Sequence, residues 1–323
     1  MKKTITLLLA AMMLLSLAAC GSSGDGDSAD KVYNVGIVQL VQHEALDKAT
    51  QGFQDALVEK LGEDQVNFDL QNASGDIPNC ATIVNGFVAD DVDLIMANAT
   101  PALLAAVNAT TTIPVLGTSV TDYGDALKIE NFDGVVGGNV SGTSDQPPLD
   151  EQAAMVTELC PDAETVAILY CSAEPNSVFQ AKAVRGYLEE AGLTVIEKTF
   201  SDSNDVVSVT TSACDEADAI YIPTDNTAAS SADAIGKVVL EQKVPVIAGE
   251  ESLMAACGIA TLSIDYYNLG YATGEMAAKI LTGEADIAEM EIAYDPNPVK
   301  KYNPEICQQL GIEAPEGYTA YEG

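Results

Sequence analysis

Short apolar runs alternate with amphipathic stretches along the chain from Val32 onward. The apolar runs are rich in Val, Ile and Leu and have the length of buried strands. The stretches between them repeat apolar positions every three to four residues, as helices do. In residues 44–61, for example, Leu46, Ala49 and Phe53 fall on one helical face. This alternation predicts α/β layers, with parallel sheets covered by helices on both faces.

The series of strands runs twice, with Pro147 and Pro148 between the two halves. Apolar β-rich runs predict strands at residues 33–38, 66–70, 94–97, 114–116 and 134–137, and again at residues 165–170, 193–198, 219–222 and 244–248. The clearest helical periodicity lies at residues 44–61, 177–191 and 228–242.

The two halves also echo each other. Asp93 opens an apolar strand followed by a polar loop, a helix and Ile113-Pro114-Val115. Asp218 opens the same order of elements, which ends at Val244-Pro245-Val246. Chance similarity between short strand–loop–helix pieces is the alternative explanation. The echo supports two Rossmann-like three-layer lobes.

An additional strand and helix at residues 259–281 indicate that the chain returns to the first lobe before it ends on the second. We therefore expect a three-crossing hinge, which permits bending while the lobes stay in register. The crossings are expected near residues 141–144, 263–264 and 283–285. Lobe 1 is expected to comprise residues 32–143 plus 264–284, and lobe 2 residues 144–263 plus 285–323.

The N-terminal segment predicts export. Lys2 and Lys3 precede an apolar run that is short for a membrane span, and Leu17-Ala18-Ala19-Cys20 resembles the bacterial lipoprotein box. We interpret residues 1–19 as a lipoprotein signal peptide, Cys20 as the lipidated first residue of the mature chain, and residues 20–31 as a flexible tether. This predicts an extracytoplasmic protein anchored to the cell membrane. The alternative is an ordinary secretory signal with an incidental cysteine.

The charge excludes one class of partner. Removal of residues 1–19 takes away Lys2 and Lys3, so the formal charge changes from −35 to 12 − 49 = −37. Binding to phosphate backbones needs clustered Lys and Arg, so no nucleic acid is expected. We attribute the acidity to solubility.

Polar loops follow the predicted strands, where open α/β sheets bind ligands. None of these loops contains Lys or Arg, which disfavours ligands with several anionic groups. Acids are present, so the balance suits a zwitterion such as an amino acid. Its carboxylate is expected at Asn176-Ser177 or Thr118-Ser119, and its amine at Asp225 or Glu250. The same residue types are also ordinary helix N-caps, and the sequence leaves both roles open.

No enzyme signature is present: the chain lacks a Gly-x-Ser-x-Gly elbow, a phosphate-binding Walker loop and a His-Glu-x-x-His helix. The single histidine, His43, is expected at a helix start or against the ligand. No cofactor is expected. No metal is expected either, because the cysteines show no paired spacing and His43 is the only histidine. Disulfides and buried thiols both remain open for the six cysteines beyond Cys20: Cys80, Cys160, Cys171, Cys214, Cys257 and Cys307.

Several segments together carry a family resemblance: residues 34–47, 117–122, 139–145, 223–226, 249–252 and 260–270. They resemble the ABC-transporter substrate-binding lipoproteins of the tryptophan/tyrosine-binding type. The resemblance implies a type I periplasmic-binding-protein fold, a ligand cleft between two lobes, and delivery of the ligand to a membrane permease with its ATPase. It also suggests an aromatic amino acid as ligand.

The loops that match the family's ligand-facing loops give a set of expected ligand-binding residues. These are Gln39, His43, Asn98, Thr100, Thr118, Ser119, Asp122, Ser172, Glu174, Asn176, Ser177, Asp225, Asn226, Glu250 and Asp265.

The leading hypothesis is therefore a monomeric solute receptor of an ABC importer that closes two lobes on one amino acid. One alternative keeps this fold and assigns a neutral ligand such as a nucleoside or a sugar. The low aromatic content and the absence of Trp weaken a sugar, because sugars commonly stack on aromatic rings. The other alternative, an exported α/β enzyme, lacks a nucleophile and base in the sequence.

Overall fold

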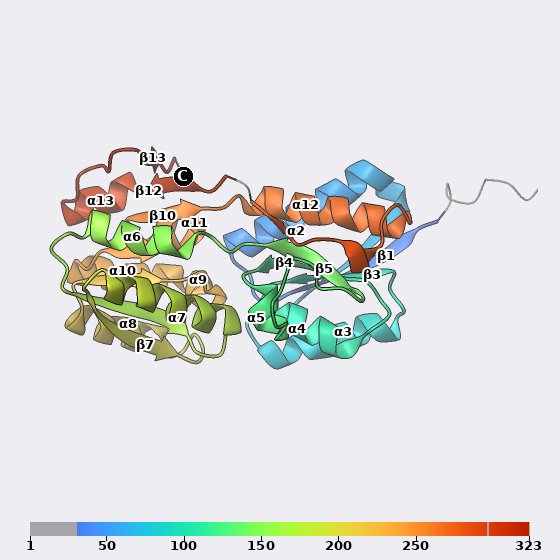
Figure 1. Ribbon diagram of the computed structural model, residues 1–323, viewed down its shortest axis with the longest axis horizontal. Coiled ribbons are helices and arrows are strands. Elements are labelled where there is room, and N and C mark those ends of the chain that lie inside the picture. Colours follow the sequence, from blue (N-terminus) through green and yellow to red (C-terminus); the bar gives the residue numbers. More distant parts are fainter. Residues whose placement is uncertain (1–30, 296, 323) are drawn as a thin grey trace, which may run out of the picture. The chain divides into compact units, whose positions relative to one another are not determined.

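The computed structural model describes residues 31–295 and 297–322. The signal peptide, the tether up to residue 30 and the lipidation of Cys20 therefore lie outside the described residues. From Tyr33 onward, two sheets with their helices form two lobes (Figure 1).

The first sheet has six parallel strands in the order β11-β5-β4-β3-β1-β2. Its two central strands are buried along their whole length, because helices cover both faces of the sheet. The strands are β1 (Tyr33–Gln39), β2 (Val66–Asn72), β3 (Leu94–Asn98), β4 (Val115–Val120), β5 (Val140–Ser144) and β11 (Ala293–Tyr294).

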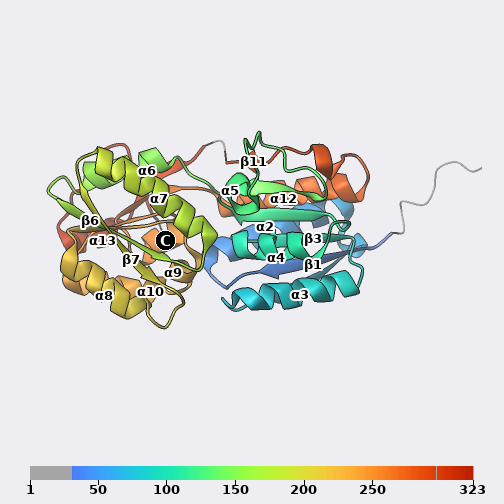
Figure 2. The ribbon, with the colours of Figure 1, turned by 60° about the horizontal axis from the view of Figure 1, so that its bottom comes forward.

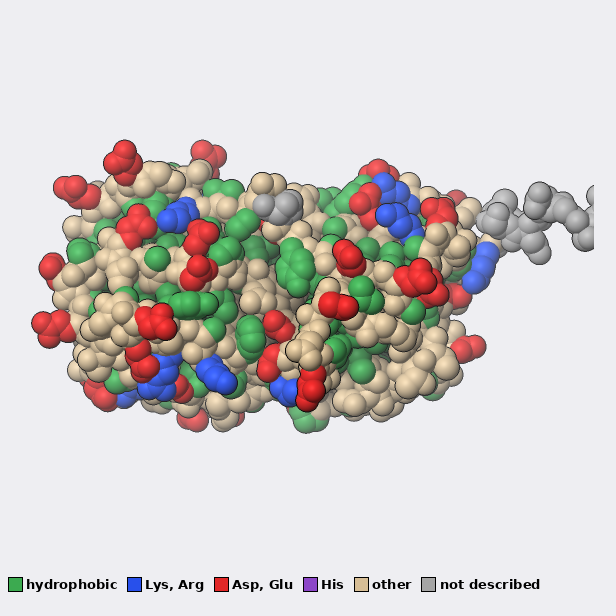
Figure 3. All heavy atoms as spheres, viewed as in Figure 1, with side chains coloured by type: hydrophobic (Ala, Val, Ile, Leu, Met, Phe, Trp, Pro, Cys, Tyr) green, Lys and Arg blue, Asp and Glu red, His purple; other side chains and the backbone are tan. Residues whose placement is uncertain are grey.

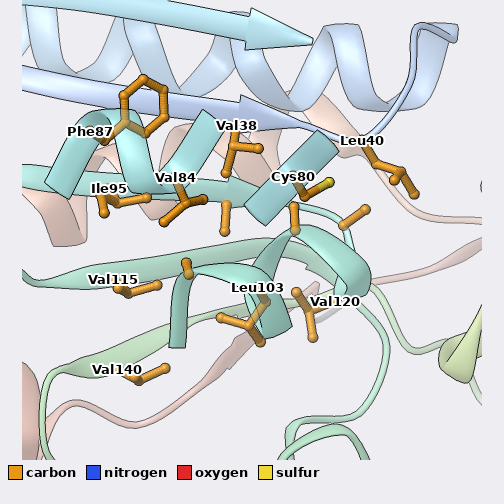
Figure 4. Packing of buried hydrophobic residues seen from close by; sticks show 14 of the residues in the cluster. Val38, Leu40, Cys80, Val84, Phe87, Ile95, Leu103, Val115, Val120 and Val140 are labelled. Carbon is orange, nitrogen blue, oxygen red and sulfur yellow. The ribbon is translucent and has the colours of Figure 1, made fainter. Parts of the chain in front are cut away.

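Two hydrophobic cores lie on the two faces of this sheet. Helices α3 (Ile77–Ala89), α4 (Thr100–Ala109) and α5 (Tyr123–Leu127) cover one face, where Phe87, Leu103 and Val115 are among the buried side chains (Figure 4). Helices α2 (Glu44–Leu61) and α12 (Tyr266–Leu281) cover the other face (Figure 1, Figure 2).

The second sheet has seven strands in the order β13-β12-β10-β9-β8-β6-β7, and only the pairing of β10 with β12 is antiparallel. Its strands are β6 (Thr165–Cys171), β7 (Thr194–Phe200), β8 (Ala219–Ile222), β9 (Val246–Ala248), β10 (Ala260–Ser263), β12 (Val299–Tyr302) and β13 (Thr319–Ala320).

Helices cover this sheet on both faces as well. One core involves α6 (Leu149–Leu159), α7 (Pro175–Glu190) and α13 (Pro304–Leu310). The other involves α8 (Val206–Glu216), α9 (Asn226–Ser230), α10 (Ala232–Gln242) and α11 (Glu251–Cys257). The expected pair of three-layer α/β lobes is confirmed.

Glycines let α2 and α12 approach closely. A Cβ atom added at Gly270 would lie 1.9 Å from the Ala49 carbonyl oxygen, and one added at Gly52 would lie 2.1 Å from the Tyr267 carbonyl oxygen. Only a residue without a side chain fits at such distances. The two helices, more than two hundred residues apart in the sequence, therefore form one layer of the first lobe.

The predicted echo has a structural counterpart at the start of each sheet. Asp93 accepts a hydrogen bond from the backbone N–H of Asn34 at 2.8 Å. Asp218 accepts bonds from the backbone N–H groups of Glu164 and Thr165 at 2.9 and 2.8 Å. Each aspartate immediately precedes its own strand and thus ties the start of that strand to the start of the neighbouring one.

The last strand of the first half is not where the sequence predicted it. Strand β5 occupies residues 140–144, whereas residues 134–137, the predicted position, lie outside the named strands. Gly134, Gly137 and Gly138 have φ angles of 102°, 81° and 62°, which an extended strand does not permit. The predicted helix at residues 228–242 is also interrupted, at Ser231 between α9 and α10.

Counted over the described residues, the chain crosses between the sheets three times. The first crossing follows β5 at residues 145–148, and the second lies between β10 and α12. The third lies between Tyr294 and Val299, not near residues 283–285 as expected, because β11 pairs with β5 of the first sheet. The segment up to Tyr294, expected in lobe 2 from residue 285 on, thus belongs to the first lobe: Ile287 and Ile292 lie in its cores, and residues 293–294 add a strand to its sheet.

The six cysteines of the described chain are free thiols. All except Cys214 are buried. Burial raises the pKa of the Cys80 thiol to about 11 and that of Cys160 to about 12. These thiols therefore contribute to the hydrophobic cores as small apolar side chains.

Candidate functional site

The carboxyl ends of β1, β3 and β4 place three expected residues side by side. Gln39 is in register with Asn98, and Asn98 is in register with Thr118. The Gln39 side chain accepts a hydrogen bond from Thr50 Oγ1 at 2.7 Å, and Asn98 Nδ2 donates to the same Thr50 oxygen at 2.9 Å. These buried bonds to α2 fix the floor of the site in lobe 1.

The two loops that follow β3 and β4 have unusual backbone conformations. Ala99 has a φ of 98° and Ser119 a φ of 54°, and neither is a glycine. Ala99 N–H donates to the Thr118 carbonyl oxygen at 3.0 Å, so the loops support each other. Left-handed conformations of such residues cost free energy and are concentrated at functional sites.

In lobe 2, Glu174 organises the opposite wall. Its carboxylate accepts hydrogen bonds from Asn226 Nδ2 at 2.6 Å, and from the backbone N–H and hydroxyl of Thr227 at 2.8 and 2.7 Å. It also accepts the backbone N–H of Asn226 at 3.2 Å and the Asn176 amide at 3.3 Å. The first turn of α9 is thereby held against the start of α7.

The two carboxylates expected to face a ligand amine are helix caps. Asp225 accepts hydrogen bonds from the backbone N–H groups of Cys171 and Ala228, both at 2.7 Å. Burial, and secondly the nearby Glu174 charge, raise the pKa of Asp225 to about 7. Glu250 accepts from the backbone N–H groups of Ser252 and Leu253 at 2.7 and 2.6 Å. In both residues each carboxylate oxygen already accepts a hydrogen bond from the protein.

The lobes meet along the residues just described, and we call this contact zone the interlobe seam. His43 Nε2 and Asn226 Oδ1 are 3.2 Å apart, and Gln180 Nε2 lies 3.5 Å from Thr121 Oγ1. Thr100 and Asp122 of lobe 1 line one small gap together with Asn176 of lobe 2. Expected residues of both lobes are therefore brought together at the seam.

Unpartnered polar atoms are concentrated at this seam. Among the described residues, six side chains have a buried polar atom without a hydrogen bond, and five of them are expected site residues. The five atoms are His43 Nδ1, Asn98 Oδ1, Thr100 Oγ1, Ser119 Oγ and Asn176 Oδ1. A buried polar atom without a partner is costly, so such a concentration indicates groups that serve a ligand.

The remaining expected residues have mainly structural contacts. Ser177 is buried and hydrogen-bonds the Asp225 side chain. Ser172 is exposed and donates to the Phe200 carbonyl oxygen at 3.2 Å. Asp122 caps α5 through the N–H of Asp125 at 2.6 Å, and exposed Asp265 caps α12.

A cavity of about 530 Å³ lies beside the hinge. Its wall includes Ala45 at the start of α2, Glu250 and Ser252 at α11, and Tyr266 at α12. Two lysines also line it: Lys48, which pairs with Glu44 at 2.6 Å, and Lys301, which pairs with Glu251 at 2.6 Å. Sequence reasoning on the loops alone did not anticipate basic residues here.

Sequence reasoning also missed residues at the junction of seam and hinge. Asp145 and Gln180 are buried, and neither was among the expected site residues. Tyr266 was noted only as an aromatic side chain near the hinge, yet its hydroxyl donates to Asp145 at 2.9 Å. The Ser-Asp sequence at 144–145 lies in a segment that carried the family resemblance, and this is the one signal that pointed to Asp145.

Two further properties concern the described part of the chain. It contains no group of three or more His, Cys, Asp or Glu side chains arranged to hold a metal ion. It also contains no helix with the length and apolar character needed to span a membrane.

Comparison with known proteins identifies the family. Residues 34–322 match the family model described as ABC transporter substrate binding protein. The chain belongs to this family.

Two relatives support the assignment of this substrate-binding protein. A tyrosine-binding protein of Clostridioides difficile (strain R20291) is 38% identical over 295 residues, which cover 88% of this chain and 85% of the relative. The crystal structure of an ABC domain in complex with L-Trp from Streptococcus pneumonia is 33% identical, with a TM-score of 0.85, covering 90% of this chain and 99% of that chain. The fold is that of a type I periplasmic binding protein, and the chain is a binding protein, not an enzyme.

A third comparison concerns the arrangement of the lobes. The ligand-free, open structure of a substrate-binding protein with adhesive properties from Clostridium difficile is 37% identical and covers 90% of this chain and 99% of that chain. Its TM-score is nevertheless only 0.67. The open structure thus has the higher sequence identity to this substrate-binding protein but superposes on it less well than the L-Trp complex does.

Acidic side chains are spread over both lobes on the face shown in Figure 3. This distribution accords with the formal charge of −35. A surface of this kind repels phosphate backbones, so it supports a small-molecule ligand over a nucleic acid.

Proposed function

We propose that this protein binds an amino acid with an aromatic side chain at the interlobe seam and delivers it to an ABC permease. The observation that carries the proposal is the coincidence of five side chains, each with one unpartnered polar atom, with the loops expected to face the ligand. The names of two relatives support the ligand class, since one is a tyrosine-binding protein and the other is a complex with L-Trp.

The unpartnered atoms suit the two ends of an amino acid. The hydroxyls of Thr100 and Ser119 can donate hydrogen bonds to a carboxylate. The amide oxygens of Asn98 and Asn176 are acceptors and can bind an ammonium group. This assignment differs from the expectation that Asp225 or Glu250 binds the amine, since both already accept backbone hydrogen bonds as helix caps. A zwitterion would be held without a carboxylate or a guanidinium in direct contact.

We further propose that the protein is exported by its signal peptide and anchored outside the cytoplasmic membrane through lipid on Cys20. Within this proposal the lobes act as a monomer on the extracytoplasmic face, where the permease and its ATPase take over the ligand. Mass spectrometry of the mature N-terminus tests the anchor: a chain that begins at an acylated Cys20 supports it, and an unmodified cysteine contradicts it.

Thermal unfolding in the presence of each standard amino acid tests the ligand class, because a specific ligand raises the melting temperature by mass action. The chain has no Trp. Fluorescence excited where only indole absorbs therefore reports bound L-tryptophan without a protein background. A response to nucleosides or sugars alone would favour the neutral-ligand alternative, and no response to any amino acid would contradict the proposal.

Replacing Ser119 with alanine tests the assignment of the carboxylate. Ser119 Oγ has no partner in the protein, so its removal should leave the melting temperature of the ligand-free protein nearly unchanged. The loss of a hydrogen bond to a charged group costs about 1.5–3 kcal/mol, so L-tryptophan affinity should fall by roughly ten- to a hundredfold. A titration by indole fluorescence measures this change.

Ser208→Ala is the control, because Ser208 is exposed on α8 and donates to the Asp205 carbonyl oxygen away from the seam. Its affinity should equal that of the wild type. Unchanged affinity in Ser119→Ala would remove Ser119 from the site.

A further inference from the structure

A ring of hydrogen bonds joins both lobes to two of the three crossings. Thr121 Oγ1 donates to Asp145 Oδ1 at 3.2 Å, and the Tyr266 hydroxyl donates to Asp145 Oδ2 at 2.9 Å. Tyr266 also shares a side-chain hydrogen bond with Thr224. Gln180 completes the ring, because its amide donates to the Thr224 carbonyl oxygen at 3.0 Å and approaches Thr121 Oγ1 at 3.5 Å.

The members of the ring come from parts that move relative to one another when lobes open. Thr121 follows β4 in the first lobe, whereas Thr224 and Gln180 belong to the second. Asp145 lies in the first crossing, and Tyr266 begins α12 directly after the second. Rotation of the lobes must separate Thr121 from Gln180 and Tyr266 from Thr224. The complete ring is therefore a property of the arrangement seen here.

The centre of the ring is a buried carboxylate. Asp145 is only 2% exposed, and in the described part of the chain it has no salt bridge. The ionisable groups that face it are the hydroxyls of Tyr266 and Tyr123 and the carboxylate of Glu250. None of these supplies a positive charge. Removing such a carboxylate from water disfavours its ionised form.

We propose that Asp145 and Tyr266 form a closure latch that sets the free-energy difference between the open and closed arrangements of the lobes. The latch rests on the proposed function in one respect, since it acts on affinity only if the ligand is held between the lobes. Both are positioning residues. They control the fraction of molecules that is competent to bind, and apparent affinity scales with that fraction.

The latch also links closure to protons. Burial, as the largest cause, raises the pKa of Asp145 to about 6 from its ordinary value of 3.8. An aspartate exposed in an open arrangement would have the ordinary value, so closure takes up a proton between these two pH values. Closure and affinity therefore increase as the pH falls. From pH 8 to pH 5, Asp145 should tighten binding by about tenfold.

Tyr266→Phe tests the latch, because it keeps the aromatic side chain and removes only the hydroxyl that joins Asp145 to Thr224. Affinity for L-tryptophan and for L-tyrosine should fall by the same factor, about tenfold, with the ratio between the two ligands unchanged. Small-angle scattering without ligand should show a larger radius of gyration than for the wild type. Tyr271→Phe, further along α12, is the matched control and should alter neither quantity.

Asp145→Asn tests the link to protons. The tenfold tightening between pH 8 and pH 5 should disappear, whereas it should persist in Asp286→Asn, which changes an exposed carboxylate away from the seam. Burial also raises the pKa of Asp225. Its hydrogen bonds to Cys171 and Ala228 lie within the second lobe, so they are kept when the lobes open and Asp225 should not contribute to the tightening.

The outcomes separate the latch from the ligand assignment. A loss in Tyr266→Phe that differs between the two amino acids would show direct ligand contact and overturn the latch. Unchanged affinity and an unchanged radius would overturn it as well. If neither amino acid binds the wild type, the ligand assignment fails. The latch then stands only if the ligand-free wild type becomes more compact from pH 8 to pH 5 and Asp145→Asn does not.

Discussion

Gly270→Ala will lower the free energy of unfolding by about 3 kcal/mol, which corresponds to a decrease of roughly 6–12 °C in melting temperature. The added Cβ atom would lie 1.9 Å from the Ala49 carbonyl oxygen and 2.6 Å from its carbonyl carbon. These are backbone atoms of α2, so no rotamer change relieves the overlap. The helices must move apart, and the buried contacts between them are lost. Calorimetry on the purified variant measures the change.

Gly86→Ala is the matched control for this prediction. Gly86 also lies within a helix, α3, but an added Cβ atom there meets nothing within 4 Å. Because alanine favours helix more than glycine by up to about 1 kcal/mol, this variant should be as stable as the wild type or slightly more stable. Equal melting temperatures for Gly270→Ala and Gly86→Ala would show that the close approach of α2 and α12 contributes nothing.

Glu174→Ala should have the second large effect, a loss of about 3 kcal/mol in the free energy of unfolding together with weaker ligand binding. The substitution removes the acceptor for the backbone N–H groups of Asn226 and Thr227, which are buried or half-buried. Buried donors without a partner each cost about 1–3 kcal/mol. The first turn of α9 is no longer held against α7, so Asn176 and Asn226 lose their positions at the seam.

Urea unfolding and L-tryptophan titration measure the two consequences separately. Glu174→Gln should give an intermediate loss, since it keeps one acceptor oxygen and the shape of the side chain. Glu190→Ala, at the exposed end of the same helix, should match the wild type in both measurements. If Glu174→Ala retains wild-type stability, its carboxylate does not organise the wall of lobe 2.

Most of the fold could be predicted because its strands and helices carry strong periodic patterns. The helix predicted at residues 44–61 and the strand predicted at residues 219–222 have the observed bounds. Strand β5 was missed because its sequence, Val-Ser-Gly-Thr-Ser, is largely polar. Its side chains find partners elsewhere in the fold: Thr143 bonds Thr118 and Thr273, and Ser144 bonds the Thr121 carbonyl oxygen. Such tertiary bonds leave no periodic signal in a sequence.

The position of the site was easier to predict than the role of each residue. Loops at the carboxyl ends of parallel strands converge for topological reasons, so Asn98, Thr118 and Asn226 could be grouped from strand order alone. Whether a polar side chain caps a helix or stays unpartnered depends on the contacts between lobes. The sequence therefore left Asp225 and Ser119 as equal candidates, whereas the structure gives Asp225 backbone partners and leaves Ser119 Oγ with none.

The pairing of α2 with α12 bears on how the molecule is made. Translation delivers α2 early, but its partner helix ends at Leu281 and β11 ends at Tyr294. The part of α2 that packs against α12 consequently stays uncovered until most of the polypeptide has left the ribosome. Domains built from contacts so distant in sequence fold slowly. Neither lobe can therefore complete its folding during synthesis. A secretion channel transports polypeptides in the unfolded form, so this delay keeps the chain in a form suited to export.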